Sequence, residues 1–257
     1  WISEISLAAP FFLAGGLGLL SMLPIWFILP ESLPEARRTQ GKVALHGPQL
    51  GVLWRALRGP IGFLLFLACL VNFALANFES VFGLYASARY AYGPQQVGTI
   101  MMVIGIVSSL VQMVLTGPAT HRFGERGVIK ASLLFSVLGF VLMSLAEGPG
   151  IILLTVGFFV FSNAMLRPAI MSLTSKMARG GQGAALGMNN AYQSLGRVAG
   201  PLWAGMMFDL NINFPYWSAA LIMLGTFGFA LWSMRPLASP LQGEAAQVAT
   251  APGIGDE

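Results

Sequence analysis

Residues 61–88 read IGFLLFLACLVNFALANFESVFGLYASA, and this stretch decides the fold class. Its only charged side chain is Glu79. A helix rises 1.5 Å per residue, so roughly 20 apolar residues cross the hydrocarbon core of a bilayer. The stretch is therefore long and apolar enough to form a transmembrane helix. The alternation over about ten residues that is typical of a transmembrane β-strand is not seen.

Six further apolar runs lie on either side of this stretch. The complete set is 10–29, 61–88, 97–116, 128–146, 151–177, 184–208 and 215–234. Hydrophobic residues make up 56% of the 257 residues and charged residues only 9%, whereas soluble domains carry about 25% charge. We therefore predict an all-α membrane protein with seven transmembrane helices and the lipid bilayer as its surroundings. A soluble bundle of seven buried helices is the disfavoured alternative, because such helices rarely need 20 successive apolar residues.

Lysine and arginine are distributed unevenly between the predicted loops. One side of the membrane receives Arg37, Arg38, Lys42, Arg55, Arg58, Arg122, Arg126, Lys130, Lys176, Arg179 and Arg235. The opposite side receives only Arg89, while Arg167 and Arg197 lie within runs. Cytoplasmic loops carry the excess of basic residues, so we expect the first side, and with it the C-terminus, to be cytoplasmic. Because these charges are spread between runs, they do not form the basic face of a nucleic-acid-binding protein.

Several kinds of chemistry lack the residues that they need. The single cysteine, Cys69, allows no disulfide within the chain. His46 and His121 lie in loops without the spacing of metal ligands. There is no phosphate-binding Gly-x-x-x-x-Gly-Lys-Ser/Thr sequence for ATP. We therefore predict no metal, no cofactor and no enzymatic activity, and an ion gradient as the energy source. The first residues lack the pattern of a signal peptide, so we expect none, and Trp1 in place of methionine suggests a fragment.

Four short motifs, at 29–32, 78–98, 117–126 and 196–205, resemble the major facilitator superfamily, and within it the twelve-helix bacterial drug:proton antiporters. Leu-Pro-Glu-Ser at 29–32 is similar to the signature that closes helix six of these exporters. Gly-Pro-Ala-Thr-His-Arg-Phe-Gly-Glu-Arg at 117–126 is similar to the loop motif Gly-x-Leu-Ala-Asp-Arg-x-Gly-Arg-Arg between helices eight and nine. It departs from that motif at His121, which replaces the acidic residue, and at Glu125, which replaces a basic one.

The other two motifs lie within predicted helices. Gly-Arg-Val-Ala-Gly-Pro at 196–201, followed by Gly205, resembles the Gly-x-x-x-Gly-Pro element of helix eleven. Phe-Glu-Ser at 78–80, with Leu-Tyr at 84–85 and Gln-Val-Gly at 96–98, resembles helix seven and the start of helix eight. Together the four motifs cover most of the chain.

The resemblance implies that the seven runs are helices six to twelve of the family fold. Residues 1–30 would then be the last helix of a missing N-terminal domain, and 31–60 the central cytoplasmic loop. Residues 61–236 would be the six-helix C-domain, built as two inverted three-helix repeats, and 237–257 a disordered cytoplasmic tail.

The function that the resemblance implies is proton-coupled efflux of small lipophilic compounds or drugs across a bacterial inner membrane, by alternating access. Its partners would be the bilayer, the small-molecule substrate, the proton and the missing N-terminal half. Three alternatives stay open: an uptake symporter or metabolite permease of the same fold, a non-transporting fragment, and, disfavoured by the missing catalytic cluster, a membrane enzyme.

Glu79 is the acidic residue placed deepest within a run, and such groups are functional candidates by default. It would carry the coupled proton, or else serve as a structural carboxylate. A buried guanidinium needs an acidic or carbonyl partner, so a Glu79–Arg197 ion pair is one alternative. Asn72 shares the helical face of Glu79 by its spacing.

The remaining candidates are polar groups in the later runs. In the family, helices seven and ten line the central cavity, so Asn163 and Arg167 resemble residues of the substrate pathway. Asn189 and Gln193 share a face with Arg197 at four-residue spacing. The alternative reading of these groups is a hydrogen-bond network that packs helices together. The loop motif implies gating residues at Gly117, Arg122, Gly124 and Arg126. Close helix approach is expected at Gly196, Gly200 and Pro201.

Overall fold

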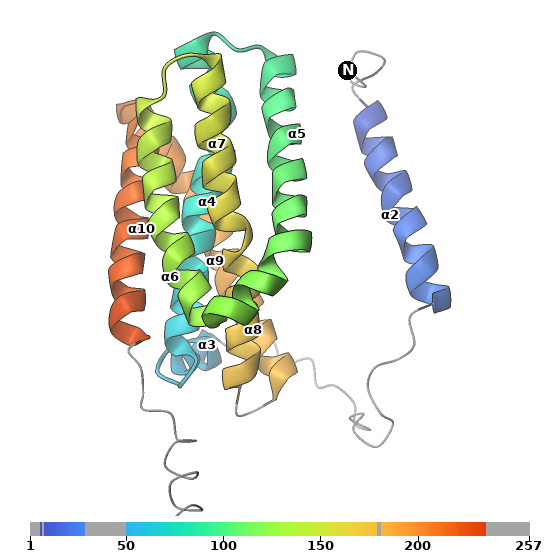
Figure 1. Cartoon of the computed structure of the whole chain (residues 1–257), viewed down its shortest axis with the longest axis vertical. Coiled ribbons are helices and arrows are strands. Elements are labelled where there is room, and N and C mark those ends of the chain that lie inside the picture. Colours follow the sequence, from blue (N-terminus) through green and yellow to red (C-terminus); the bar gives the residue numbers. More distant parts are fainter. Residues whose placement is uncertain (1–5, 7, 29–49, 179–180, 235–257) are drawn as a thin grey trace, which may run out of the picture. The chain divides into compact units, whose positions relative to one another are not determined.

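The computed structural model describes residues 6, 8–28, 50–178 and 181–234. Within these ranges every regular element is a helix (Figure 1), as the sequence predicts. The elements are α2 (Ala9–Ile28), α3 (Leu50–Leu57), α4 (Gly62–Tyr90), α5 (Pro94–Leu110), the π-helical turn η2 (Val111–Leu115), α6 (Thr116–Leu145), α7 (Pro149–Ala164), α8 (Leu166–Met177), α9 (Gln182–Leu210) and α10 (Phe214–Ser233). The motif at 29–32, residues 31–49 of the expected central loop and the expected tail at 237–257 lie outside the described residues.

The chain divides into two compact units, residues 1–49 and 50–257. In the first unit, α2 has 20 residues and none of them is buried. Its length of about 30 Å equals the thickness of the hydrocarbon core. The predicted run at 10–29 therefore forms one helix of spanning length.

Among the described residues, five helical segments are long and apolar enough to cross a membrane, against seven predicted runs. One of them, Pro94–Leu145, has 52 residues, which is about 78 Å of helix and more than twice the hydrocarbon thickness. Gly124 interrupts it with a φ of 67°, in the region that favours glycine. This bend separates the predicted runs at 97–116 and 128–146. The run at 184–208 forms α9, which has the length to span but is too polar to be among the five.

Two features of the helices differ from the prediction. The run at 151–177 is two helices, because Met165 lies between α7 and α8. Pro168 explains the break, since it cannot donate a backbone hydrogen bond to Ala164 and its ring would clash with that carbonyl. The segment 31–60, expected to be a loop, contains the short helix α3. Because α7 and α8 continue in the same direction and together have spanning length, they still correspond to the single predicted run at 151–177.

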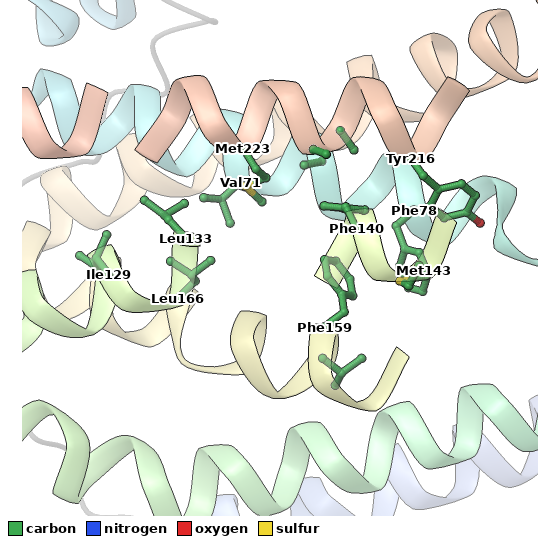
Figure 2. Packing of buried hydrophobic residues seen from close by; sticks show 14 of the residues in the cluster. Val71, Phe78, Ile129, Leu133, Phe140, Met143, Phe159, Leu166, Tyr216 and Met223 are labelled. Atoms are coloured by element: carbon green, nitrogen blue, oxygen red, sulfur yellow. The ribbon is translucent and has the colours of Figure 1, made fainter. Parts of the chain in front are cut away.

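Aromatic side chains from three helices meet in the core of the second unit (Figure 2). The ring centroid of Phe159 on α7 lies 5.0 Å from that of Phe78 on α4 and 4.4 Å from that of Phe140 on α6. Gly139 permits this contact, since a Cβ there would lie 2.9 Å from the Cβ of Phe159. The core thus fixes α4, α6 and α7 against one another.

The backbones of α4 and α9 approach closely at two glycines. A Cβ on Gly196 would lie 2.3 Å from the carbonyl oxygen of Cys69, and one on Gly200 would lie 2.6 Å from that of Phe73. Real Cβ atoms do not approach other atoms so closely, so only glycine fits at either position. Pro201 follows within α9. The small-xxx-small pair therefore brings α9 directly onto α4.

The helices of the second unit alternate in direction, so its two ends collect different residues (Figure 1). One end holds α3, the start of α4, the bend of α6 and the end of α8. We call it the basic end, because it carries Arg55, Arg58, Arg122, Arg126, Lys130 and Lys176. At the other end, Arg89 is the only lysine or arginine among the described residues.

Candidate functional site

A cavity of about 630 Å³ lies among α4, α5, η2, α7 and α8. It is lined by Leu75, Phe78, Glu79, Met101, Ile104, Ser108, Gln112, Phe159, Val160, Asn163, Ala164, Arg167, Pro168 and Met171. The lining is mostly apolar, and its charged groups are Glu79 and Arg167. A few polar groups on an apolar wall are typical of a small-molecule site. No cluster of three or more His, Cys, Asp or Glu that could hold a metal occurs in the described ranges.

Helix α4 places Glu79 on the cavity wall. Leu75, Phe78 and Glu79 follow three- and four-residue spacing, so they lie on one helical face. The Glu79 side chain is exposed and makes no hydrogen bond or ion pair with any described residue. Asn72 lies elsewhere: it is buried, and its Nδ2 donates to the Ala68 carbonyl at 2.8 Å. The carboxylate is therefore free to bind a proton or a substrate group.

Arg167 lines the cavity from α8, where a chain of hydrogen bonds holds it. One terminal nitrogen donates to Gln193 Oε1 at 3.2 Å, and Gln193 in turn donates to Asn189 Oδ1. Asn189 Nδ2 then donates to Thr174 Oγ1 at 3.3 Å. Asn189 is fully buried and Gln193 nearly so. The chain joins α8 to α9 and fixes the direction of the guanidinium.

Asn163 lines the cavity one turn before Arg167. Its side chain is 8% exposed, and its Nδ2 donates to the Phe159 carbonyl at 3.1 Å. Its Oδ1 and the Nε of Arg167 have no hydrogen-bond partner among the described residues. Buried polar atoms of this kind call for a partner, so this wall has hydrogen-bonding capacity to spare.

Arg197 is not part of the cavity lining. Its side chain on α9 is exposed and forms no ion pair with Glu79 within the described part of the chain. Both Arg197 and Arg167 are near enough to act electrostatically on Glu79. The three charges thus form a loose group rather than a closed salt bridge.

The loop motif lies at the basic end, away from the cavity. Gly124 forms the bend, and the next residue, Glu125, accepts hydrogen bonds from Lys176 and from Ser172, the latter at 3.0 Å. The Lys176 partner holds the pKa of Glu125 below its ordinary range. Glu125 therefore ties the bend of α6 to the end of α8. Gly117 has open space around it, and Arg122 is exposed beside the ring of Phe123.

Sequence reasoning missed two polar residues of the cavity, Ser108 and Gln112. They are four residues apart in a mostly apolar run, and that spacing is the signal that could have identified them. Gln112 belongs to the π-helical turn η2. Such turns occur frequently at functional sites.

Comparison with known families and proteins places the chain among membrane transporters. The sequence profile described as Major Facilitator Superfamily matches residues 1–201 and 64–252. The chain is 30% identical over 234 residues to Multidrug resistance protein 2 of Bacillus subtilis (strain 168), which covers 90% of this chain and 58% of that protein. It is 32% identical over 227 residues to Quinolone resistance protein NorA of Staphylococcus aureus (strain N315), covering 87% and 56%.

A solved structure supports the fold alone. The human organic anion transporter MFSD10 (TETRAN) matches 74% of this chain and 43% of its own, with a TM-score of 0.61 and 21% identity. The chain spans less than two thirds of the length of these relatives.

Proposed function

The chain belongs to the Major Facilitator Superfamily, and from this membership we propose that it is part of a transporter that exports small lipophilic compounds in exchange for protons. It is a multi-pass membrane protein with the bilayer around it. The names of the relatives, multidrug resistance and quinolone resistance proteins, support export as the direction. The chain covers 58% of the first of them, so a further half that completes the transport path is part of the proposal.

One observation carries the proposal: Glu79 is a carboxylate on the wall of a mostly apolar cavity, and no described residue forms an ion pair or hydrogen bond with it. A charged side chain at the centre of a membrane costs at least about 2.5 kcal/mol on insertion scales. A carboxylate kept there without a fixed partner is suited to alternate between a proton and a substrate. In an exporter, the inward-facing cavity would load the compound at charged Glu79. Protonation from outside would then release it, and the proton would leave toward the cytoplasm.

The hydrogen-bonded wall formed by α7 and α8 would orient the substrate. Gln193 fixes the guanidinium of Arg167, and Asn163 has a free acceptor beside it. These groups would bind a polar substituent while the aromatic and methionine side chains contact the apolar body. Asn189 would act by positioning Gln193, and Asn72 would support packing within α4. No covalent step is needed, so we propose transport without enzymatic chemistry.

Two further parts of the proposal concern gating and orientation. The glycines of α9 would keep a close α4–α9 contact while the domain rocks, and the loop motif with Arg122 and Arg126 would gate at the basic end. The excess of basic residues at that end supports a cytoplasmic position for it. The C-terminus would then be cytoplasmic, in a bacterial inner membrane.

The test uses the complete transporter gene, with Glu79→Gln compared with Glu79→Asp. Cells loaded with a fluorescent dye are energised, and efflux is followed alongside dye binding to purified protein. We expect Glu79→Gln to abolish gradient-driven efflux while keeping expression and binding, and Glu79→Asp to retain part of the activity. The matched control is Glu147→Gln, an exposed carboxylate outside the cavity. Normal efflux by Glu79→Gln at normal stability would refute the proton-carrying role. If cells with the unaltered transporter accumulate dye instead of exporting it, an uptake symporter is favoured.

Transport by the chain alone is a separate test. The proposal requires cavity walls from both halves, so vesicles containing only these 257 residues should move dye no faster than empty vesicles. Gradient-driven transport by the chain alone would require two copies to form the path.

A further inference from the structure

Helix α3 is held firmly at the basic end by its inner face. Leu53, Ala56 and Leu57 pack against a small cluster that includes Ile61 and Tyr192. The Tyr192 hydroxyl donates to the Leu53 carbonyl at 2.9 Å. The junction to α4 is equally tight, because a Cβ on Gly62 would lie 1.8 Å from the Leu57 carbonyl oxygen. This short helix is therefore fixed to α4 and α9.

The outer face of α3, together with Arg58 just past its last residue, combines an aromatic ring with two positive charges. Trp54 is 61% exposed, and Arg55 and Arg58 are exposed beside it. The guanidinium carbon of Arg58 lies 5.6 Å from the centroid of the Trp54 ring, in cation–π contact. Tryptophan is enriched at membrane–water interfaces, and basic side chains near a membrane surface are attracted to anionic lipids.

The position of α3 along the bundle agrees with that boundary. Helix α4 has 29 residues, about nine more than the hydrocarbon core requires, so its ends reach the headgroup level. Arg58 precedes the start of α4 by four residues, and α3 lies beside that start (Figure 1). This position agrees with a location of the Trp54 face at the depth of lipid headgroups.

The surrounding charge selects the kind of lipid. Among the described residues, the basic end carries the six lysine and arginine side chains named above. Glu125, the acidic residue described at this end, is already bound to Lys176. The resulting positive field attracts anionic headgroups. A soluble anion would satisfy the arginines but would leave the Trp54 ring in water.

We propose that Trp54, Arg55 and Arg58 form a binding surface for anionic phospholipids, with the guanidinium groups on the lipid phosphate and the indole ring at the glycerol level. This surface lies apart from the cavity and does not depend on the transport proposal. It would anchor the start of α4 in the leaflet that the basic end faces.

The test is the thermal midpoint of the chain in nanodiscs of phosphatidylcholine, with and without phosphatidylglycerol. We expect phosphatidylglycerol to raise the midpoint, and the double variant Arg55→Gln/Arg58→Gln to lose most of that rise. The control Arg89→Gln, at the other end, should keep it. An unchanged rise in the double variant would overturn the proposal. So would an equal rise when soluble glycerol phosphate is added to phosphatidylcholine nanodiscs, since free phosphate would then be the ligand.

A depth measurement remains informative even if a variant folds poorly. Gly51 shares the outer face of α3 and has open space around its Cβ position, so Gly51→Cys accepts a spin label. The native cysteine is first removed by Cys69→Ser. We expect the label to be accessible to oxygen at headgroup depth. Full accessibility to an aqueous nickel reagent alone would show that α3 does not lie on the lipid, and would overturn the proposal.

Discussion

Replacing Gly196 by alanine tests whether the contact between α4 and α9 holds the second unit together. The new Cβ would lie 2.3 Å from the carbonyl oxygen of Cys69 and 2.8 Å from the amide nitrogen of Phe73. An ordinary contact begins at 3.4 Å, so the overlap with the oxygen is 3.4 − 2.3 = 1.1 Å. Both obstacles are backbone atoms, which no change of rotamer can move. The two helices must therefore separate.

The expected cost follows from two opposing effects. Overpacking of a close contact costs about 1–3 kcal/mol, and this site belongs at the upper end because the obstacle is backbone. Alanine has a better helix propensity than glycine by about 1 kcal/mol. We therefore expect Gly196→Ala to lower the free energy of unfolding by about 1–2 kcal/mol.

The assay is thermal unfolding of the purified chain in detergent, followed by circular dichroism. A loss of 1 kcal/mol lowers the midpoint of a domain of this size by about 2–4 °C. The matched control is Gly205→Ala on the same helix, where nothing lies within 4 Å of the new Cβ. It should leave the midpoint unchanged or raise it. If Gly196→Ala is as stable as the unaltered chain, or if both variants lose equally, the close contact does not carry the stability assigned to it.

Three further results are expected. Asn189→Ala should lower the free energy of unfolding by about 1–3 kcal/mol, because it interrupts the buried hydrogen-bond chain. The control Asn190→Ala, at an exposed position, should lower it by almost nothing, and equal losses in the two variants would contradict this expectation. The pKa of Glu125 is lowered in the folded chain from its ordinary value of 4.5, so this carboxylate stabilises the fold at pH values above 4.5. That stabilisation is lost as the pH falls below 4.5. Glu125→Gln should therefore flatten the acid limb of a stability–pH curve, by under about 1 kcal/mol because Lys176 is exposed. Arg126→Cys, in a chain without the native cysteine, should not react with an impermeant thiol reagent on intact cells and should react after lysis. Labelling before lysis would show that the basic end faces the outside of the cell.

The helical passes and the outstanding carboxylate could be read from the sequence. An apolar run is a local property, and the bilayer sets the length that it must have, so 61–88 and its counterparts are visible without any tertiary information. Glu79 is conspicuous because every neighbour in its run is uncharged. The glycine pair at 196 and 200 is likewise a spacing signal, although the sequence does not reveal that its partner is α4.

The tertiary structure decided which of the polar residues share a site. Asn72 and Glu79 lie on one face by periodicity, yet the packing of α4 buries the first and leaves the second on the cavity. Ser108 and Glu125 acquire their surroundings from α7 and α8, which are distant in sequence. Helical spacing defines directions around one axis only. The neighbour that a side chain meets depends on how other helices pack against that axis, and for this chain the close approach of glycines and the break at Met165 set that packing.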